Sequence, residues 1–151
     1  MSDKSSSKFR VTVILADYCQ VADGKMNMMG AWWDTIGPGP HPMAVALRFE
    51  VPWNEINKKH EFQLQLLTQD GQQLLIQTAE GNAPLGISGV LEVSPDAGAK
   101  EGRHLSIPQA VNFGPLPLPP GLNLVWKVFI NGKSEHTWQA NFTTRPNPAS
   151  A

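Results

Sequence analysis

Residues 43–51 read MAVALRFEV. Every second residue of this stretch is apolar and larger than alanine, whereas Arg48 and Glu50 occupy alternate positions. Successive side chains of a β-strand point to opposite faces, so a period of two predicts a strand with one face in a core. The residues expected on that inner face are Met43, Val45, Leu47, Phe49 and Val51.

The same alternation recurs along the chain. It is clear in residues 62–66, 122–130 and 138–142. Weaker patterns predict further strands at 9–16, 25–36, 73–79, 87–94 and 104–113. The sequence therefore predicts about eight to nine strands, by the spacing rules for apolar residues.

Three dipeptides lie between alternating runs: Asp23-Gly24, Asp70-Gly71 and Asn131-Gly132. Glycine adopts the positive φ that a two-residue hairpin loop requires, and aspartate or asparagine tolerates that region better than most residues. We therefore expect β-hairpins at these three places and a mostly antiparallel sheet.

An antiparallel sheet with one wet face needs a cover for its apolar face. The sequence has almost no helical pattern, apart from a possible single turn in residues 53–58 after Pro52. A second sheet must therefore supply the cover. We predict an all-β fold, an antiparallel β-sandwich of immunoglobulin-like, Greek-key or jelly-roll type. The proline-rich segments 37–42 and 114–121 are expected to be connections.

The 151 residues are expected to form one domain over 9–144, with disordered tails at 1–8 and 145–151. A net charge of −1 without a basic cluster argues against nucleic acid as a partner. No apolar run is long enough for a membrane span, and no signal peptide is recognisable. Because Cys19 is the only cysteine, an internal disulfide is impossible, and we expect a cytoplasmic protein.

Catalytic and metal-binding patterns do not stand out. The four histidines are far apart in the sequence, and none has a partner at metal-ligand spacing. Cys19, Ser88 and Ser94 lack the flanking residues of a recognisable nucleophile. We therefore expect no enzyme activity, no cofactor and no metal site.

A set of local motifs resembles a family of small uncharacterised bacterial domains of unknown function. The motifs are Leu15-Ala-Asp-Tyr18, Gln20-Val21, Asp23-Gly24-Lys25, Asn27, Gly30, Trp33, Val51-Pro-Trp53 and the segment 114–121. The resemblance spans roughly 11–143. It implies a β-sandwich that stands alone, and it carries no activity or site residue onto this chain.

The least usual local feature is Trp32-Trp33, because neighbours in a strand face opposite ways and one indole must leave the core. Apolar residues at outward positions are a second signal: Val125 and Phe129 flank Lys127, and Ile14, Leu67, Leu75 and Val90 are similar. The candidate partner or ligand surface comprises Trp32, Trp33, Asp34, His41, Arg48, Trp53, Val125, Lys127 and Phe129.

Two classes of function fit this surface. The first is a non-enzymatic binding or assembly module that engages a protein partner or itself, including a structural component of a phage or secretion apparatus. The second is a carbohydrate or small-ligand binding protein or hydrolase, with a tryptophan stacked on a sugar and Asp34 or Glu50 bonding its hydroxyls.

Overall fold

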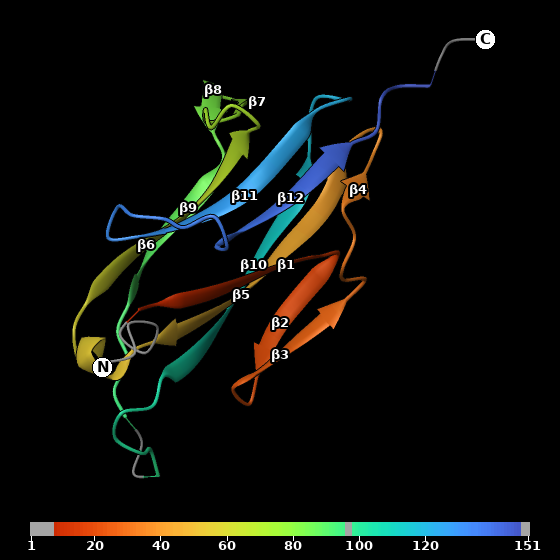
Figure 1. Ribbon diagram of the computed structural model, residues 1–151. Helices are drawn as coiled ribbons and strands as arrows, with labels where there is room; N and C mark the ends of the chain where they lie inside the picture. The colour runs from red at the N-terminus through yellow and green to blue at the C-terminus, as the bar shows by residue number, and fades with distance from the viewer. Residues whose placement is uncertain (1–7, 96–97, 149–151) are drawn as a thin grey trace.

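The computed structural model describes residues 8–95 and 98–148, and within them nearly all regular structure is β-strand (Figure 1). The strands are β1 Arg10–Ala16, β2 Tyr18–Ala22, β3 Lys25–Met29, β4 Thr35–Ile36, β5 His41–Val51, β6 His60–Thr68, β7 Leu75–Thr78, β8 Gly81–Pro84, β9 Gly86–Leu91, β10 Leu105–Leu116, β11 Asn123–Ile130 and β12 Gln139–Thr144. A 3₁₀ turn, η2, covers Trp53–Glu55 where the sequence predicted a possible helical turn.

Two sheets form a sandwich, as the sequence predicted. The three-stranded sheet has the order β1-β5-β10, and the five-stranded sheet has the order β4-β12-β11-β6-β9. All pairings are antiparallel except that of β12 with the short β4, which is parallel. The remaining strands form two separate hairpins, β2-β3 and β7-β8.

The core lies between the two sheets. The five apolar residues larger than alanine in MAVALRFEV, the stretch that forms most of β5, are each no more than 1% exposed. From the opposite sheet Trp126 is fully buried, stacks on Phe113 at 4.9 Å between ring centres and donates its indole N–H to the Met43 sulfur. Alternation in the sequence thus identified the inner face correctly.

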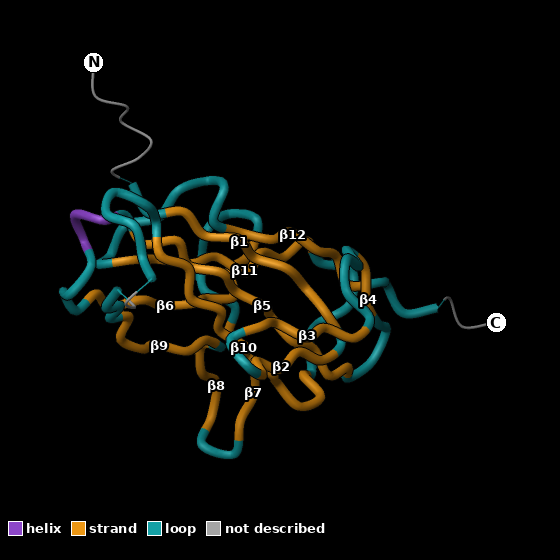
Figure 2. The backbone as a smooth tube through the Cα atoms, turned by 90° about the horizontal axis from the view of Figure 1, so that it is seen from below, coloured by secondary structure: helices purple, strands orange, loops and turns teal. Residues whose placement is uncertain are grey.

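The β2-β3 hairpin forms a partial third layer on the outer face of the three-stranded sheet (Figure 1). The β7-β8 hairpin instead projects from the body of the sandwich (Figure 2). The outer face of the five-stranded sheet receives no such layer within residues 8–95 and 98–148.

Two of the three predicted two-residue turns have the expected backbone. Both residues of Asp23-Gly24 and of Asn131-Gly132 have positive φ, which matches a tight hairpin loop. At Asp70-Gly71 only the glycine does. There Leu67, within β6, forms an isolated bridge with Gln73, and β7 pairs with β8 instead of with β6.

Some strand boundaries differ from the prediction. Residues 25–36 are not one strand, because positive φ angles at Gly30 and Trp32 turn the chain away after β3. The described part of the chain has twelve strands, more than the eight to nine predicted. The prediction missed short strands such as β4 and β8, because they have too few residues for a clear alternation.

Two prolines of the predicted connections lie in strands, because Pro42 lies within β5 and Pro115 lies within β10. Pro108, in the strand predicted at 104–113, also lies within β10. The strand β10 is an edge strand, where a missing N–H leaves no central ladder bond unmade.

The predicted tails fall largely outside the described residues, which exclude 1–7 and 149–151. Arg145, placed in the tail by sequence, donates its backbone N–H to the Ile36 carbonyl and its guanidinium to the Gly37 carbonyl. None of the helical structure in 8–95 and 98–148 has the length and apolar character needed to cross a bilayer.

Candidate functional site

The β2-β3 hairpin rests on an alanine-rich half of the three-stranded sheet. Ala16 and Ala44 lie opposite each other in the sheet and are completely buried, as is Cys19 on β2. Ala46 and the partly buried Ala110 continue this small second core. Short side chains let the two layers approach closely, so packing holds the base of the hairpin in place.

Asn112 on β10 fastens the same end of the hairpin. Its side-chain oxygen accepts the Cys19 backbone N–H at 3.1 Å, and its side-chain nitrogen donates to the Cys19 carbonyl at 2.8 Å. The amide thus satisfies both backbone groups of Cys19 as a neighbouring strand would.

The Cys19 thiol is part of this packing and is not exposed to solvent. Its sulfur lies 3.7 Å from the Val45 carbonyl oxygen, to which the thiol donates. Burial raises the pKa of the thiol. A buried, protonated thiol is a poor nucleophile, so Cys19 acts as a small apolar side chain here.

A tight turn follows the hairpin at Gly30. The backbone N–H of Asp17 donates to the carbonyls of both Met29 and Gly30 at 3.0 Å. Gly30 has a φ of +61°, a left-handed backbone that favours glycine, and a Cβ at this position would contact the Asp17 carboxylate. The Asp17 carboxylate lies beside the turn, 3.7 Å from the His41 ring.

Trp32 leaves this turn with its side chain in water. Its φ is +73°, a conformation unfavourable for a bulky residue, and it is 80% exposed. Its backbone N–H donates to the Leu15 carbonyl at 3.0 Å, which fixes the position of the residue. The structure thus holds this indole outside the fold.

Two more exposed apolar side chains lie at the same end of the hairpin. Tyr18 and Met29 are direct cross-strand partners, and they are 48% and 69% exposed. They occupy the face of the hairpin opposite to Cys19, since their positions alternate with it. We call Tyr18, Met29 and Trp32 the hairpin patch.

The sequence predicted that one indole of the Trp32-Trp33 pair leaves the core. In the structure Trp32 is the outer residue and Trp33 is the inner one. Trp33 packs edge-on against Phe142 at 5.9 Å between ring centres. Its indole N–H is buried and has no hydrogen-bond partner in the described residues.

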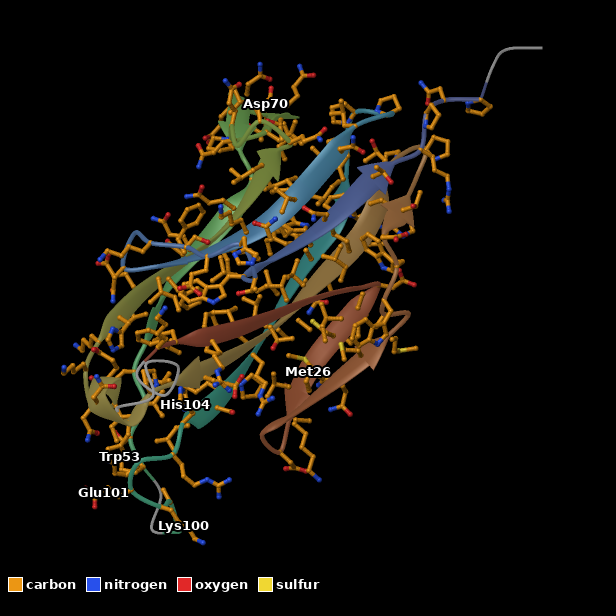
Figure 3. All side chains as sticks on the ribbon, viewed as in Figure 1. Met26, Trp53, Asp70, Lys100, Glu101 and His104 are labelled. Atoms are coloured by element: carbon orange, nitrogen blue, oxygen red, sulfur yellow. The ribbon has the colours of Figure 1, made fainter. Side chains whose placement is uncertain are left out.

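The other predicted site residues are distributed over several regions. Asp34 follows Trp33 and is exposed, and His41 lies beside Asp17. Arg48 is on the outer face of the three-stranded sheet, near the other end of the hairpin, and its guanidinium donates to the Ser106 hydroxyl at 3.1 Å. Trp53 lies in η2, away from the hairpin that carries Met26 (Figure 3).

Val125, Lys127 and Phe129 lie on the outer face of the five-stranded sheet. Val125 is only 9% exposed because it packs beside Leu67, its direct partner on β6. The Lys127 ammonium lies 5.8 Å from the centre of the Phe129 ring. The nine predicted residues therefore do not form one surface, and the hairpin patch contains only Trp32 among them.

Comparison with protein families gives one match. The model of DUF6941, a family of unknown function, matches residues 11–142. The chain belongs to this family. Searches of the curated proteins and of the solved structures found no match to this chain.

The matched region of this DUF6941 protein contains the sandwich core, the hairpin and the turn that presents Trp32. In the described residues of the DUF6941 chain, no three histidine, cysteine, aspartate or glutamate side chains lie together in a way that could hold a metal ion.

Sequence reasoning missed Tyr18 and Met29. The signal was present: Cys19, Val21, Met26 and Met28 alternate with Tyr18, Gln20, Asn27 and Met29 across the Asp23-Gly24 turn. Such a hairpin has one apolar face, and an apolar Tyr18–Met29 pair on its second face marks an unpaired surface of this DUF6941 protein.

Proposed function

We propose that this protein is a non-catalytic binding module that recruits a protein partner through the hairpin patch. The observation that carries the proposal is Trp32, an indole 80% exposed on a residue whose φ is +73°.

The argument is energetic. A left-handed backbone costs a residue with a side chain roughly 1–2 kcal/mol. An exposed indole regains none of that cost through burial in the fold. Strain of this kind at an exposed, hydrogen-bonded residue supports a role in contact with another molecule.

The composition of the hairpin patch supports a protein as that molecule. Tryptophan and tyrosine are the residues most enriched among the few that dominate protein interfaces. Methionine adapts its shape to a partner surface and contacts aromatic rings favourably. Tyr18, Met29 and Trp32 combine these properties at one end of a hairpin whose base is fixed by Asn112.

The proposal can be tested by site-specific crosslinking. A photoreactive phenylalanine analogue replaces Trp32 in one protein and the 63% exposed Val90, on β9, in another. Both are irradiated in an extract of the source cells, and crosslinked proteins are identified by mass spectrometry. We expect one protein that is captured at position 32 and not at position 90.

The captured protein is then purified and its affinity measured by calorimetry. Trp32→Ala should weaken binding about 30-fold, the effect of about 2 kcal/mol expected for a central interface aromatic. Leu75→Ala, at an exposed apolar residue on β7, should leave the affinity unchanged.

Three results would overturn the proposal. They are equal capture at positions 32 and 90, an affinity that Trp32→Ala leaves unchanged, and an oligosaccharide that binds to the unmodified chain and loses affinity in Trp32→Ala. Light scattering over a range of concentrations separates a distinct partner from a second copy of the chain.

A further inference from the structure

A groove lies on the inner side of the β2-β3 hairpin, opposite to the hairpin patch. It has a volume of about 380 Å³ and opens between β3 and the outer face of the three-stranded sheet. Gly24, at the tip of the hairpin, is among the lining residues, whereas the tightly packed Cys19 is not. The groove therefore occupies the part of the hairpin where the two layers separate.

The lining of the groove is mainly apolar. Met26 and Met28 contribute from the hairpin, and Ile14, Ala46 and Pro108 contribute from the sheet. Ile14 and Ala46 are direct partners, so the floor is continuous across β1 and β5. Methionine side chains are flexible, and a volume of this size is typical of small-ligand pockets.

Arg48 gives one end of the groove a positive charge. It is the only ionisable residue among the lining residues, and its side chain is 58% exposed. Its guanidinium lies 3.1 Å from the Ser106 hydroxyl and 3.9 Å from the Glu50 carboxylate. The contact with Glu50 is too long for a strong hydrogen bond, so the guanidinium retains donors for another anion.

We infer that the groove binds an apolar chain with an anionic head group. The chain lies between the methionines and the floor of Ile14 and Ala46, and the head group accepts hydrogen bonds from Arg48. This inference goes beyond the proposed function, because the groove and the hairpin patch are on opposite sides of the hairpin.

The methionines allow a direct test, because four of the five lie in three distinct environments. Met26 and Met28 line the groove, Met29 belongs to the hairpin patch and Met43 is buried in the core. The protein is labelled at the methionine methyl groups and titrated with decanoate below the micellar concentration of decanoate. We expect the NMR signals of Met26 and Met28 to move, and those of Met29 and Met43 to stay.

The head group is tested with a matched ligand and a matched variant. Decyltrimethylammonium has the same chain length with a cationic head, and it should bind at least about tenfold more weakly than decanoate. Arg48→Gln should weaken decanoate binding about tenfold, the effect of losing one charge-assisted hydrogen bond. Lys127→Gln removes a cation from the other sheet and should have no effect.

Stationary Met26 and Met28 signals throughout the decanoate titration would overturn the inference. Movement of Met29 alone would place the ligand on the hairpin patch and would overturn it too. Equal affinity of the protein for decanoate and decyltrimethylammonium would refute the anionic head group. Equal affinity of the unaltered protein and of Arg48→Gln for decanoate would refute it too. If dilution of the chain alone moves Met26 and Met28, a second copy occupies the groove instead.

Discussion

The two outer faces of the sandwich differ in what covers them. On the three-stranded sheet, Ala44 and Ala46 lie under the hairpin, whereas Arg48 and Glu50 continue the same strand face toward solvent. On the five-stranded sheet, amides and Lys127 share the outer face with apolar residues such as Leu67, Val125 and Phe129, and the described residues place no layer over them. The outward amides are Gln63, Gln65, Asn123, Gln139 and Asn141.

The difference shows how the outward side chains of a strand indicate whether a further layer covers it. Small apolar residues at outward positions allow a second backbone to approach, and long polar ones keep it away. In MAVALRFEV the outward positions change from Ala44 and Ala46 to Arg48 and Glu50. The residue types at the outward positions of this one strand therefore distinguish the covered part of the face from the uncovered part.

A charge under the hairpin should have the largest effect. Ala44→Glu places a carboxylate at a position that is completely buried among Ala16, Cys19 and Ala46. We expect a loss of about 3 kcal/mol in the free energy of unfolding, measured with urea. On the outer face of the five-stranded sheet, which we call the open face, Asn141→Glu should change the free energy of unfolding by less than about 0.5 kcal/mol. Similar losses in the two variants would show that the faces do not differ.

Removal of the amide that fastens the hairpin should have a smaller effect. Asn112→Ala deletes two hydrogen bonds to Cys19, so we expect a loss of about 2 kcal/mol. Amide hydrogen exchange should become faster in β2 and β3 than in β5. The control is Asn141→Ala on the open face, where exchange should be unchanged. Unaltered exchange in the hairpin of Asn112→Ala would refute the role of this amide.

The Cys19 thiol predicts a pH dependence of stability. Burial raises its pKa in the folded chain, so the folded state holds the thiol proton more tightly than the unfolded state. The resulting stability is complete below the unfolded pKa, near the ordinary value of 9.0, and is lost as the pH rises through the raised folded pKa. Denaturant titrations should therefore show a decline above about pH 9.

The control for this decline is Cys19→Ala, which removes the titrating group while keeping a small apolar side chain. Its stability should vary less with pH over the same alkaline range. Identical alkaline profiles for Cys19→Ala and the unaltered chain would assign the decline to other groups.

Substitution of Trp32 should have the smallest effect on stability. Its indole contacts water, so Trp32→Ala should change the free energy of unfolding by less than about 0.5 kcal/mol. Val90→Ala, at an exposed residue of the five-stranded sheet, should behave in the same way. A thermal scan of both variants tests this. A loss of several kcal/mol in Trp32→Ala would assign the residue to the fold.

The fold could be predicted because its strongest signal is local. Period-two alternation marked the inner faces of β5, β6 and β11, and the Asp23-Gly24 and Asn131-Gly132 turns marked two chain reversals. The short strands β4 and β8 could not be found in this way, because pairing with another strand, and not their own pattern, makes them strands. The partner of β4 is the distant β12, and the partner of β8 is the preceding β7.

The candidate site was harder to predict than the fold. Sequence reasoning singled out the Trp32-Trp33 pair but could not say which indole faces outward. The positive φ of Gly30 and of Trp32 decides this, and it depends on bonds from Asp17 to Met29 and Gly30. Trp53 was grouped with them as an aromatic residue, and Val125 and Phe129 as apolar residues at outward strand positions. The fold places all three elsewhere.

The amino-acid sequence by itself determined that this chain forms two packed antiparallel sheets, because apolar alternation depends only on the geometry of a strand. Tertiary structure alone decided that β2 and β3 fold over one outer face and leave a groove beneath their tip. It also decided that Tyr18, Met29 and Trp32 are exposed to water. The reason is that such arrangements depend on contacts between segments far apart in the chain, such as Asn112 with Cys19.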